Sequence, residues 1–236
     1  MLFRSSRLFQ FQLDKEKTYI AKFKFGYTTD TLDVTGEITD RTAVIPTRTE
    51  IEKSLGNFMG FIDQVPPKYS AKCIDGKRGY QLARRGEEFT LPPKKVLIKN
   101  IALLSQTDEN EFEFKIECGG GTYIRSLARD IGIACNSLGV MSELCRTKSG
   151  VFTIENAVTV EEFKASSNPE QFLIPSDMAV DFPKLILSAD RAQKILDGVY
   201  EDYGFSDGIY RVYNESAFWG VGESKEGKLK IKAYVR

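Results

Sequence analysis

Residues 111–132, EFEFKIECGGGTYIRSLARDIG, constrain the fold of this chain more than any other stretch. Charged and apolar residues alternate up to Cys118, which predicts a half-buried β-strand. Apolar residues from Ile124 to Ile131 then recur at helical spacing. The glycines between the two patterns predict a tight strand-to-helix turn. The chain must therefore combine a sheet with helices.

Arg125 lies in the first turn of that predicted helix, where the partial positive charge of the helix N-terminus opposes a cation. A structural turn explains the three glycines but not this arginine. A carboxylate or phosphate opposite the guanidinium would outweigh a dipole effect of ~0.3–1 kcal/mol. The turn matches neither the GxxxxGK[ST] phosphate loop nor the GxGxxG dinucleotide fingerprint. Residue patterns alone leave the ligand open.

The chain has no histidine, which excludes His-based catalysis and the usual zinc ligand sets. Its four cysteines form no CxxC pair, which favours reduced thiols in a cytosolic protein. Catalysis would have to use carboxylates, lysine, arginine, tyrosine, serine or cysteine. No apolar run is long enough to span a membrane, and the first residues do not resemble a signal peptide.

Charge is balanced overall but uneven along the chain. The formal net charge is zero, which gives no global argument for a polyanionic partner. Residues 68–85 nevertheless hold six cations against one acid, and residues 225–236 hold five against one. Such clusters are typical of solvated faces as well as of nucleic-acid surfaces. Binding to nucleic acid stays open.

The patterning predicts an α+β fold with a mixed or antiparallel central sheet and flanking helices. Strands are expected from residue 17 and over 94–106 and 111–118, the last two joined by a turn at 108–110. A helix capped by Thr49 is expected to continue to Pro66-Pro67. Further helices are expected over 124 to about 137 and after a cap at Thr159. Further elements expected along the chain are a short strand, turn and helix closed by Gly86, and a strand-like segment over 150–158.

A boundary is predicted near Pro175 to Pro183, which gives domains of residues 1–178 and 179–236. The second domain should be small and β-rich, and small enough to need the first beside it. It is expected to hold a short helix from Ala189 to Leu196 and the strands GIYRVYN, AFWGVGES and KLKIKAYV, joined by glycine turns.

Three blocks in register, residues 14–38, 64–88 and 118–132, resemble the TruB family of bacterial tRNA pseudouridine synthases. The resemblance implies a catalytic domain of the pseudouridine-synthase type over 1–178, followed by a PUA-like RNA-binding domain over 179–236. It also implies an isomerase that flips a uridine of the tRNA TΨC loop (position 55) out of its stack. The enzyme would convert that uridine to pseudouridine without a cofactor.

The resemblance assigns site residues by position. Tyr19 matches the tyrosine that stacks on the target base, and Arg125 matches the arginine that pairs with the catalytic aspartate. Tyr123 and Leu144 match residues that line the uracil pocket.

The resemblance also implies a surface for the RNA backbone. Tyr69, Lys72 and Arg78, with their basic neighbours, are expected to contact the phosphates of the TΨC stem-loop. The expected partner is tRNA, and we expect a cytoplasmic monomer that needs no metal and touches no membrane.

The family nucleophile is an aspartate in a GxxGTLDPxAxG block, which does not occur in these 236 residues. The segment DTLDVTG (30–36) is superficially similar but matches a later TDTxDxxG loop of the family. We therefore interpret Asp33 as a loop carboxylate and not as the nucleophile. We expect a fragment that begins after the nucleophile, is inactive alone and offers Arg125 no carboxylate of its own.

Two other interpretations remain. One is a non-catalytic protein that binds or folds tRNA on the same scaffold. The other is an unrelated α+β protein with a carboxylate- or phosphate-binding turn at residues 119–125. Failure to bind tRNA at low salt would favour the latter.

Overall fold

A computed structural model of the chain describes residues 4–12, 15–70, 73–74, 77–87, 89–197, 202–215 and 217–235. The chain divides into two compact units, one of residues 14–149 and one that combines residues 1–13 with 150–236. The predicted boundary between residues 178 and 179 lies inside the second of these units, and it stays a prediction.

The unit of residues 14–149 is built on an antiparallel sheet. Its strands run in the order β9-β1-β8-β7-β4. Their bounds are β1 (Lys17–Phe25), β4 (Gly60–Gln64), β7 (Lys94–Asp108), β8 (Glu111–Cys118) and β9 (Gly139–Ser149). The β7–β8 hairpin pairs as predicted from the sequence, with Asp108 opposite Glu111. Two small hairpins complete the unit: β2 (Tyr27–Thr29) with β3 (Ile38–Arg41), and β5 (Cys73–Ile74) with β6 (Lys77–Arg78).

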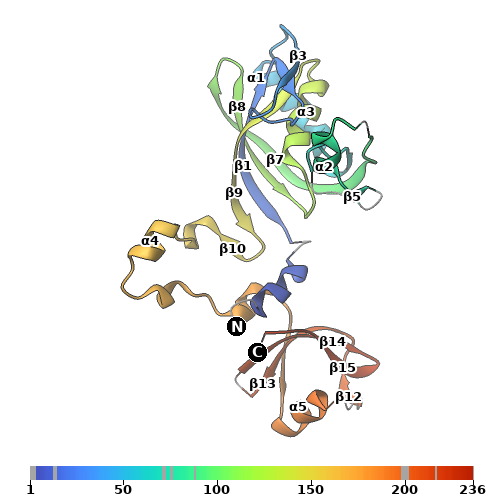
Figure 1. Cartoon of the computed structure of the whole chain (residues 1–236), viewed down its shortest axis with the longest axis vertical. Coiled ribbons are helices and arrows are strands. Elements are labelled where there is room, and N and C mark those ends of the chain that lie inside the picture. The colour runs from blue at the N-terminus through green and yellow to red at the C-terminus, as the bar shows by residue number, and fades with distance from the viewer. Residues whose placement is uncertain are drawn as a thin grey trace. The chain divides into compact units, whose positions relative to one another are not determined.

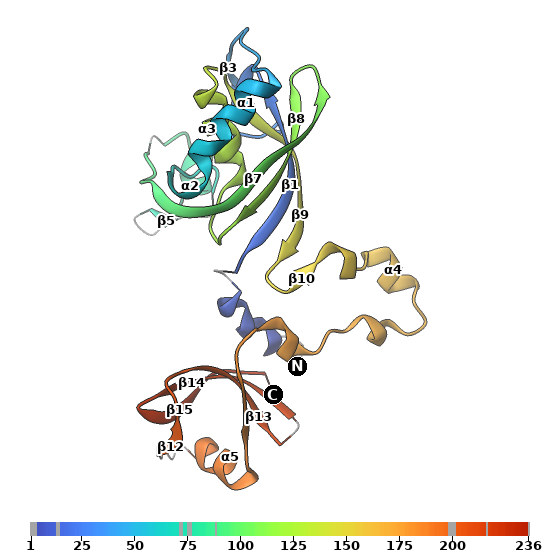
Figure 2. The same cartoon turned by 180° about the vertical axis from the view of Figure 1, so that it is seen from behind.

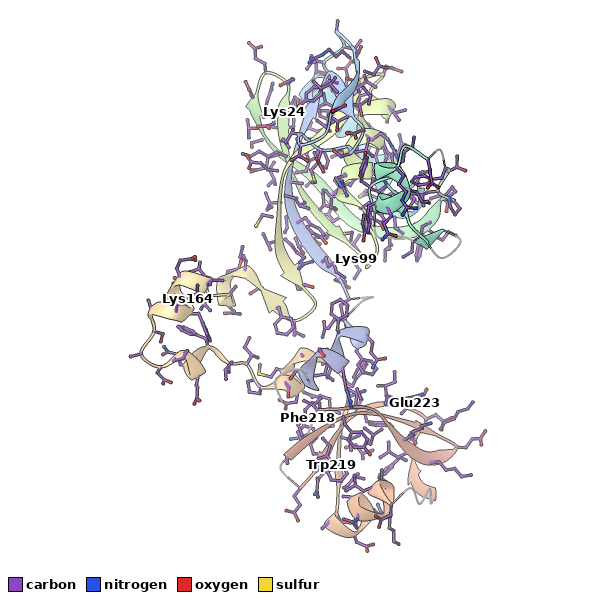
Figure 3. The ribbon with its side chains drawn as sticks, in the orientation of Figure 1. Lys24, Lys99, Lys164, Phe218, Trp219 and Glu223 are labelled. Atoms are coloured by element: carbon purple, nitrogen blue, oxygen red, sulfur yellow. The ribbon has the colours of Figure 1, made fainter. Side chains whose placement is uncertain are left out.

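Helices α1 (Arg48–Leu55) and α3 (Ile124–Ala134) lie together on one face of this sheet (Figure 1 and Figure 2). The short helix α2 (Gly79–Arg84) follows β6. Alternate residues of β1 and β8 point toward α1 and α3, and their phenylalanine rings are fully buried: Phe23, Phe25, Phe112 and Phe114. The intervening positions are charged, and Lys24 of β1, labelled in Figure 3, pairs with Glu111 of β8 at 3.7 Å. The sheet therefore buries one face and solvates the other, as period-two alternation predicts.

Residues 47–64 differ from the prediction. Thr47, not Thr49, caps α1, because its hydroxyl accepts from Glu50 N–H while the Glu50 carboxylate accepts from Thr47 N–H. The helix ends at Leu55 and does not continue to Pro66. Gly60 adopts φ +84°, which a helix cannot contain, and residues 60–64 pair with β7 as strand β4. The helical spacing of Phe58 and Phe61 was misleading.

The sequence analysis also missed a strand. Residues 139–149 form β9, which pairs with β1 along its whole length. The predicted strand over 150–158 is reduced to β10 (Phe152–Thr153) and a 3₁₀ turn, η3 (Ile154–Asn156). The predicted cap at Thr159 is correct and starts α4 (Val160–Ala165).

The unit of residues 1–13 and 150–236 contains the predicted β-rich C-terminal part. Its strands run in the order β11-β13-β14-β15-β12. Their bounds are β11 (Lys184–Leu187), β12 (Asp202–Phe205), β13 (Gly208–Asn214), β14 (Ala217–Lys225) and β15 (Gly227–Tyr234), and α5 spans Ala189–Leu196 as predicted. Besides β10, η3 and α4, the unit contains the 3₁₀ helices η1 (Arg4–Phe11), η4 (Pro169–Phe172) and η5 (Ser176–Ala179).

This C-terminal sheet packs on both faces. Neighbouring residues Phe218 and Trp219 of β14 point to opposite sides, as Figure 3 shows. Trp219 belongs to the cluster that includes Ile195 of α5. Phe218 packs on a second cluster, which includes Leu8 of η1 and Val180. Within the described residues, no helix is both long and apolar enough to cross a membrane.

Candidate functional site

The strand-to-helix turn singled out from the sequence forms as expected. Strand β8 ends at Cys118, Gly121 adopts φ +81°, and α3 starts at Ile124 with Tyr123 as its N-cap residue. A positive φ at residue 121 favours glycine, since only glycine adopts it without strain. Arg125 therefore lies in the first turn of α3, where the helix dipole alone would disfavour its charge.

Arg125 joins three segments that are far apart in sequence. Its Nη1 donates to the Thr31 carbonyl at 2.9 Å and to Asp33 Oδ2 at 3.0 Å. Its Nη2 donates to the Tyr69 carbonyl at 2.9 Å. These contacts use three of the five N–H groups of a guanidinium. Among the residues that the structure describes, no acceptor meets the Nε–H or the second Nη2 N–H.

Asp33 corrects the expectation that this chain offers Arg125 no carboxylate. The ion pair lies in a partly open position, since the two side chains are 23% and 19% exposed. It neutralises the charge that the helix dipole disfavours. The sequence analysis placed Asp33 in a loop, correctly, but did not predict this partner because the two residues lie 92 positions apart.

The Asp33 carboxylate is also bound to its own loop. Oδ1 accepts from the Thr31 hydroxyl at 2.9 Å, the Thr35 hydroxyl at 2.5 Å and the Thr35 N–H at 3.1 Å. Burial raises the pKa of Asp33, but these hydrogen bonds and the Arg125 charge outweigh it and hold the pKa below its ordinary value. The carboxylate is therefore ionised at neutral pH, with both oxygens occupied.

Three other predicted residues lie on β1, on β9, which was not predicted, and at the start of α3. Tyr19 of β1 packs against the core of the sheet and lies opposite Arg146 of β9. Burial raises the pKa of Tyr19, so the phenol stays protonated at neutral pH. Leu144 of β9 is 45% exposed. Tyr123 is held through its backbone by both ends of the Gln64 amide.

The expected RNA-backbone surface is only partly visible. Tyr69 takes part in the site through its carbonyl, which binds Arg125. Lys72 lies outside the described residues, and so does the side chain of Arg78, although its backbone forms β6. Lys68 is exposed, and Arg85 makes a long contact of 3.8 Å with Glu87.

A large cavity adjoins this site without containing it. It has a volume of about 910 Å³ and is lined by residues of the 28–32, 65–69 and 83–91 segments and by Arg129 and Ile133 of α3. Neither Arg125 nor Asp33 lines it. The two segments that hold Arg125 nevertheless form part of its wall, so the cavity lies beside the ion pair.

The sequence analysis missed Gln64, Thr31 and Thr35. The threonines have a local signal, since a Thr-x-Asp-x-Thr spacing lets both hydroxyls reach the central carboxylate. Gln64 has no such signal, because its partner lies 59 residues away. No group of three or more histidine, cysteine, aspartate or glutamate side chains that could hold a metal occurs in the described part of the chain.

Comparison with known proteins gives consistent matches. The family model "TruB family pseudouridylate synthase (N terminal domain)" matches residues 1–124, and "tRNA pseudouridylate synthase B C-terminal domain" matches residues 125–181. A tRNA pseudouridine synthase B of Aquifex aeolicus is 38% identical over 234 residues, which are 97% of this chain and 81% of that protein. One of Caldanaerobacter subterraneus is 34% identical, with the same two shares covered.

Solved structures match in fold. A chain of a Cbf5-Nop10-Gar1 complex aligns with a TM-score of 0.65 at 21% identity, over 98% of this chain and 64% of its own length. A chain of an H/ACA RNP bound to a substrate RNA containing 2'-deoxyuridine aligns with a TM-score of 0.67 at 18% identity, over 99% of this chain and 70% of its own.

Proposed function

Because this chain belongs to the TruB family of pseudouridylate synthases, we propose that it recognises the TΨC stem-loop of tRNA. Its site would serve the isomerisation of the uridine at position 55 to pseudouridine. The observation that carries this proposal is the Arg125 guanidinium, held by two distant segments, residues 31–33 and Tyr69, with N–H groups left for another anion.

The proposed roles of the other residues follow the family. Tyr19 stacks on the extruded uracil, and Tyr123 and Leu144 line the pocket that receives it. The half-exposed Leu144 and the protonated Tyr19 support this assignment, since a neutral base needs apolar walls and a neutral ring. Tyr69, Lys72 and Arg78 would follow the RNA backbone, and the PUA-like residues 179–236 would add a second RNA surface.

The nucleophile is the part that these residues do not supply. Isomerisation needs a carboxylate that attacks the nucleoside. The N1–C1′ bond breaks, the freed uracil is rejoined to C1′ through C5, C5 loses its proton and N1 gains one. Asp33 is poorly suited, because both of its oxygens already accept hydrogen bonds or pair with Arg125. We propose that a second carboxylate, from a GTLDP-type block that the 236 residues lack, binds the remaining N–H groups of Arg125. The 236-residue polypeptide alone would then bind RNA without turnover.

A non-catalytic tRNA-binding or tRNA-folding protein is the second candidate. Both oxygens of the Asp33 carboxylate already have hydrogen-bond or ion-pair partners. This is expected of a non-catalytic protein, and equally of an enzyme whose nucleophile is a different carboxylate. Both candidates require the chain to bind RNA through the same surface.

Affinity for a TΨC stem-loop tests this shared requirement. Tyr19→Ala should weaken binding by ~1–3 kcal/mol, the value of one base–aromatic stack. Tyr19→Phe keeps the ring and should bind as the wild type does, which makes it the matched control. Binding should also fall steeply with salt, because phosphate contacts release counterions. Equal affinities of the two variants would mean that Tyr19 only packs in the core. A flat response to salt would mean that the basic residues are only solvated and do not contact phosphates.

A further inference from the structure

Gln64, the last residue of β4, is a buried amide with only 1% of its surface exposed. Its Oε1 accepts from the Tyr123 N–H at 2.8 Å, and its Nε2 donates to the Tyr123 carbonyl at 3.1 Å. One bond would let the partner pivot. Two bonds to the same backbone residue close a ring and fix both its position and its orientation.

The residue held in this way is the start of α3. Tyr123 is the N-cap residue, and its own side chain makes no capping hydrogen bond. Its carbonyl also accepts from Leu127 N–H at 3.2 Å, so it closes the first turn of the helix. Gln64 thus accepts from the N-cap N–H, as the Glu or Gln at the third helical position of a capping box does; in α3 that position is Ser126. Arg125 lies only two positions after Tyr123.

The segment from Gln64 to Tyr69 continues along the same helix. The Val65 carbonyl accepts from Ser126 Oγ at 2.8 Å and from Arg129 Nη2 at 3.1 Å. At its far end the Tyr69 carbonyl accepts from Arg125. Pro66 and Pro67 between these points are buried, and their rings restrict φ. The segment of residues 64–69, which we call the strap, is therefore stiff. Gln64 lies at one end of it, and the Tyr69 carbonyl that binds Arg125 lies at the other.

We propose that Gln64 is a positioning residue for Arg125. It fixes the register of α3 against the strap, so that the guanidinium reaches Asp33, Thr31 and Tyr69 together. A side chain that only filled space could be apolar, because a buried amide is costly unless its hydrogen bonds are made. The inference rests on the proposed function only in giving Arg125 a part in the reaction; the positioning itself can be measured without RNA.

The test uses Gln64→Met, which keeps the length of the side chain and removes both hydrogen bonds. In the chain labelled with ¹⁵N-arginine, Arg125 should give resolved Nη–H signals, because its contacts slow rotation about the Cζ–Nη bonds. Arg125→Lys identifies those signals by their loss. In Gln64→Met we expect the rotation to accelerate by about tenfold, the effect of roughly one lost hydrogen bond.

Gln106→Met is the matched control. The Gln106 amide also bonds to backbone, donating to the Asp108 and Glu109 carbonyls at 3.1 and 3.2 Å, but in an exposed turn. The Gln106→Met variant should leave the Arg125 signals unchanged. Gln64→Glu, which keeps the acceptor for Tyr123 N–H, gives an intermediate rate and decides the question if Gln64→Met does not fold. Arg125 signals like those of the wild type in a folded Gln64 variant would overturn the proposal.

Discussion

At the scale of single residues, the structure explains why an arginine is tolerated in the first turn of α3. The unfavourable dipole is worth only ~0.3–1 kcal/mol, whereas Arg125 gains a carboxylate and two carbonyls. Asp33 is prepared for this role by its own loop, whose threonines hold it in place and keep its pKa low. The pair therefore links the β2–β3 hairpin to α3.

Arg125→Lys should destabilise the unit of residues 14–149. A lysine ammonium cannot reach Asp33, Thr31 and Tyr69 at once, because its donors sit on one atom and lack the planar fork of arginine. We expect a loss of about 1–3 kcal/mol in the free energy of unfolding, measured with urea. Arg48→Lys removes the fork from an exposed pair with Glu52 and should cost under ~0.5 kcal/mol. Equal losses in the two variants would mean that Arg125 is an ordinary surface ion pair.

At the residue scale, the sequence predicted where the key arginine lies but not which residues bind it. The position of Arg125 was predictable from the 3.6-residue period, and its need for an anion from the helix dipole. The identity of the anion was not, since Asp33 meets Arg125 only through the tertiary fold. Gln64 was invisible for the same reason, because its partners are the backbone atoms of a distant turn.

At the scale of elements, α3 and β9 approach so closely that only glycines fit between them. A Cβ on Gly132 would lie 2.7 Å from Gly139 N, and one on Gly139 would lie 2.4 Å from the Ala128 carbonyl oxygen. Backbone atoms line both contacts, so no flexible side chain can move aside. This approach sets the depth at which α3, and with it Arg125, sits on the sheet.

Gly132→Ala should therefore cost about 1–3 kcal/mol, as overpacking in a core does. Gly56→Ala is the matched control, because Gly56 has helical backbone angles (φ −57°, ψ −29°) and nothing within 4 Å of an added Cβ. That substitution should stabilise by about 0.4–1 kcal/mol. Urea unfolding measures both. A Gly132→Ala variant as stable as the wild type would show that α3 and β9 are less closely packed than described.

The C-terminal sheet contains a contact that should respond to alkaline pH. Tyr213 of β13 donates to Asp177 Oδ2 at 2.6 Å, and burial together with this bond raises the pKa of Tyr213 to about 12. The ordinary pKa of tyrosine is ~10, so the unfolded chain loses the proton first. The stabilisation is therefore complete below pH ~10 and is lost as the pH rises towards 12.

Melting temperatures at a series of pH values measure this contribution. Tyr213→Phe should melt lower than the wild type at neutral pH but lose less stability between pH ~10 and ~12. Tyr210→Phe removes a hydroxyl that donates to the Ser206 carbonyl on the surface, and it should keep the wild-type slope. Parallel curves for Tyr213→Phe and the wild type would contradict a Tyr213–Asp177 contribution.

The elements differ in how far the sequence predicted them, and the reason is local. Strands β1 and β8 alternate cleanly, and α3 and α5 carry clear apolar faces, so all four were predicted. Strand β9 was missed because its central residues 143–146 are exposed and show no period. Strand β4 was read as helix because Phe61 of the strand and Phe58 before it happen to have helical spacing, and only the pairing of β4 with β7 decides the outcome.

At the scale of the whole molecule, each unit has a sheet suited to a different part of the proposed task. The unit of residues 14–149 holds the Arg125–Asp33 pair, and β15 of the C-terminal sheet carries three lysines at alternate positions, of which Lys232 pairs with Glu223. Large exposed apolar side chains concentrate between residues 144 and 178: Leu144, Val151, Phe152, Ile154, Val158, Val160, Phe163, Leu173, Ile174 and Met178. Because exposed apolar side chains favour association, we predict that this polypeptide is poorly soluble.

The most direct measurement is a single-turnover assay with the 236-residue polypeptide in excess over a TΨC stem-loop. We expect the stem-loop to be bound and no pseudouridine to form, because the proposed mechanism assigns the attack to a carboxylate other than Asp33, from a GTLDP-type block. Binding should be measured in the same samples, so that a lack of product cannot be confused with a lack of complex. Formation of pseudouridine, abolished by Asp33→Asn or Asp30→Asn, would show that this chain carries its own nucleophile and would contradict the proposed division of roles.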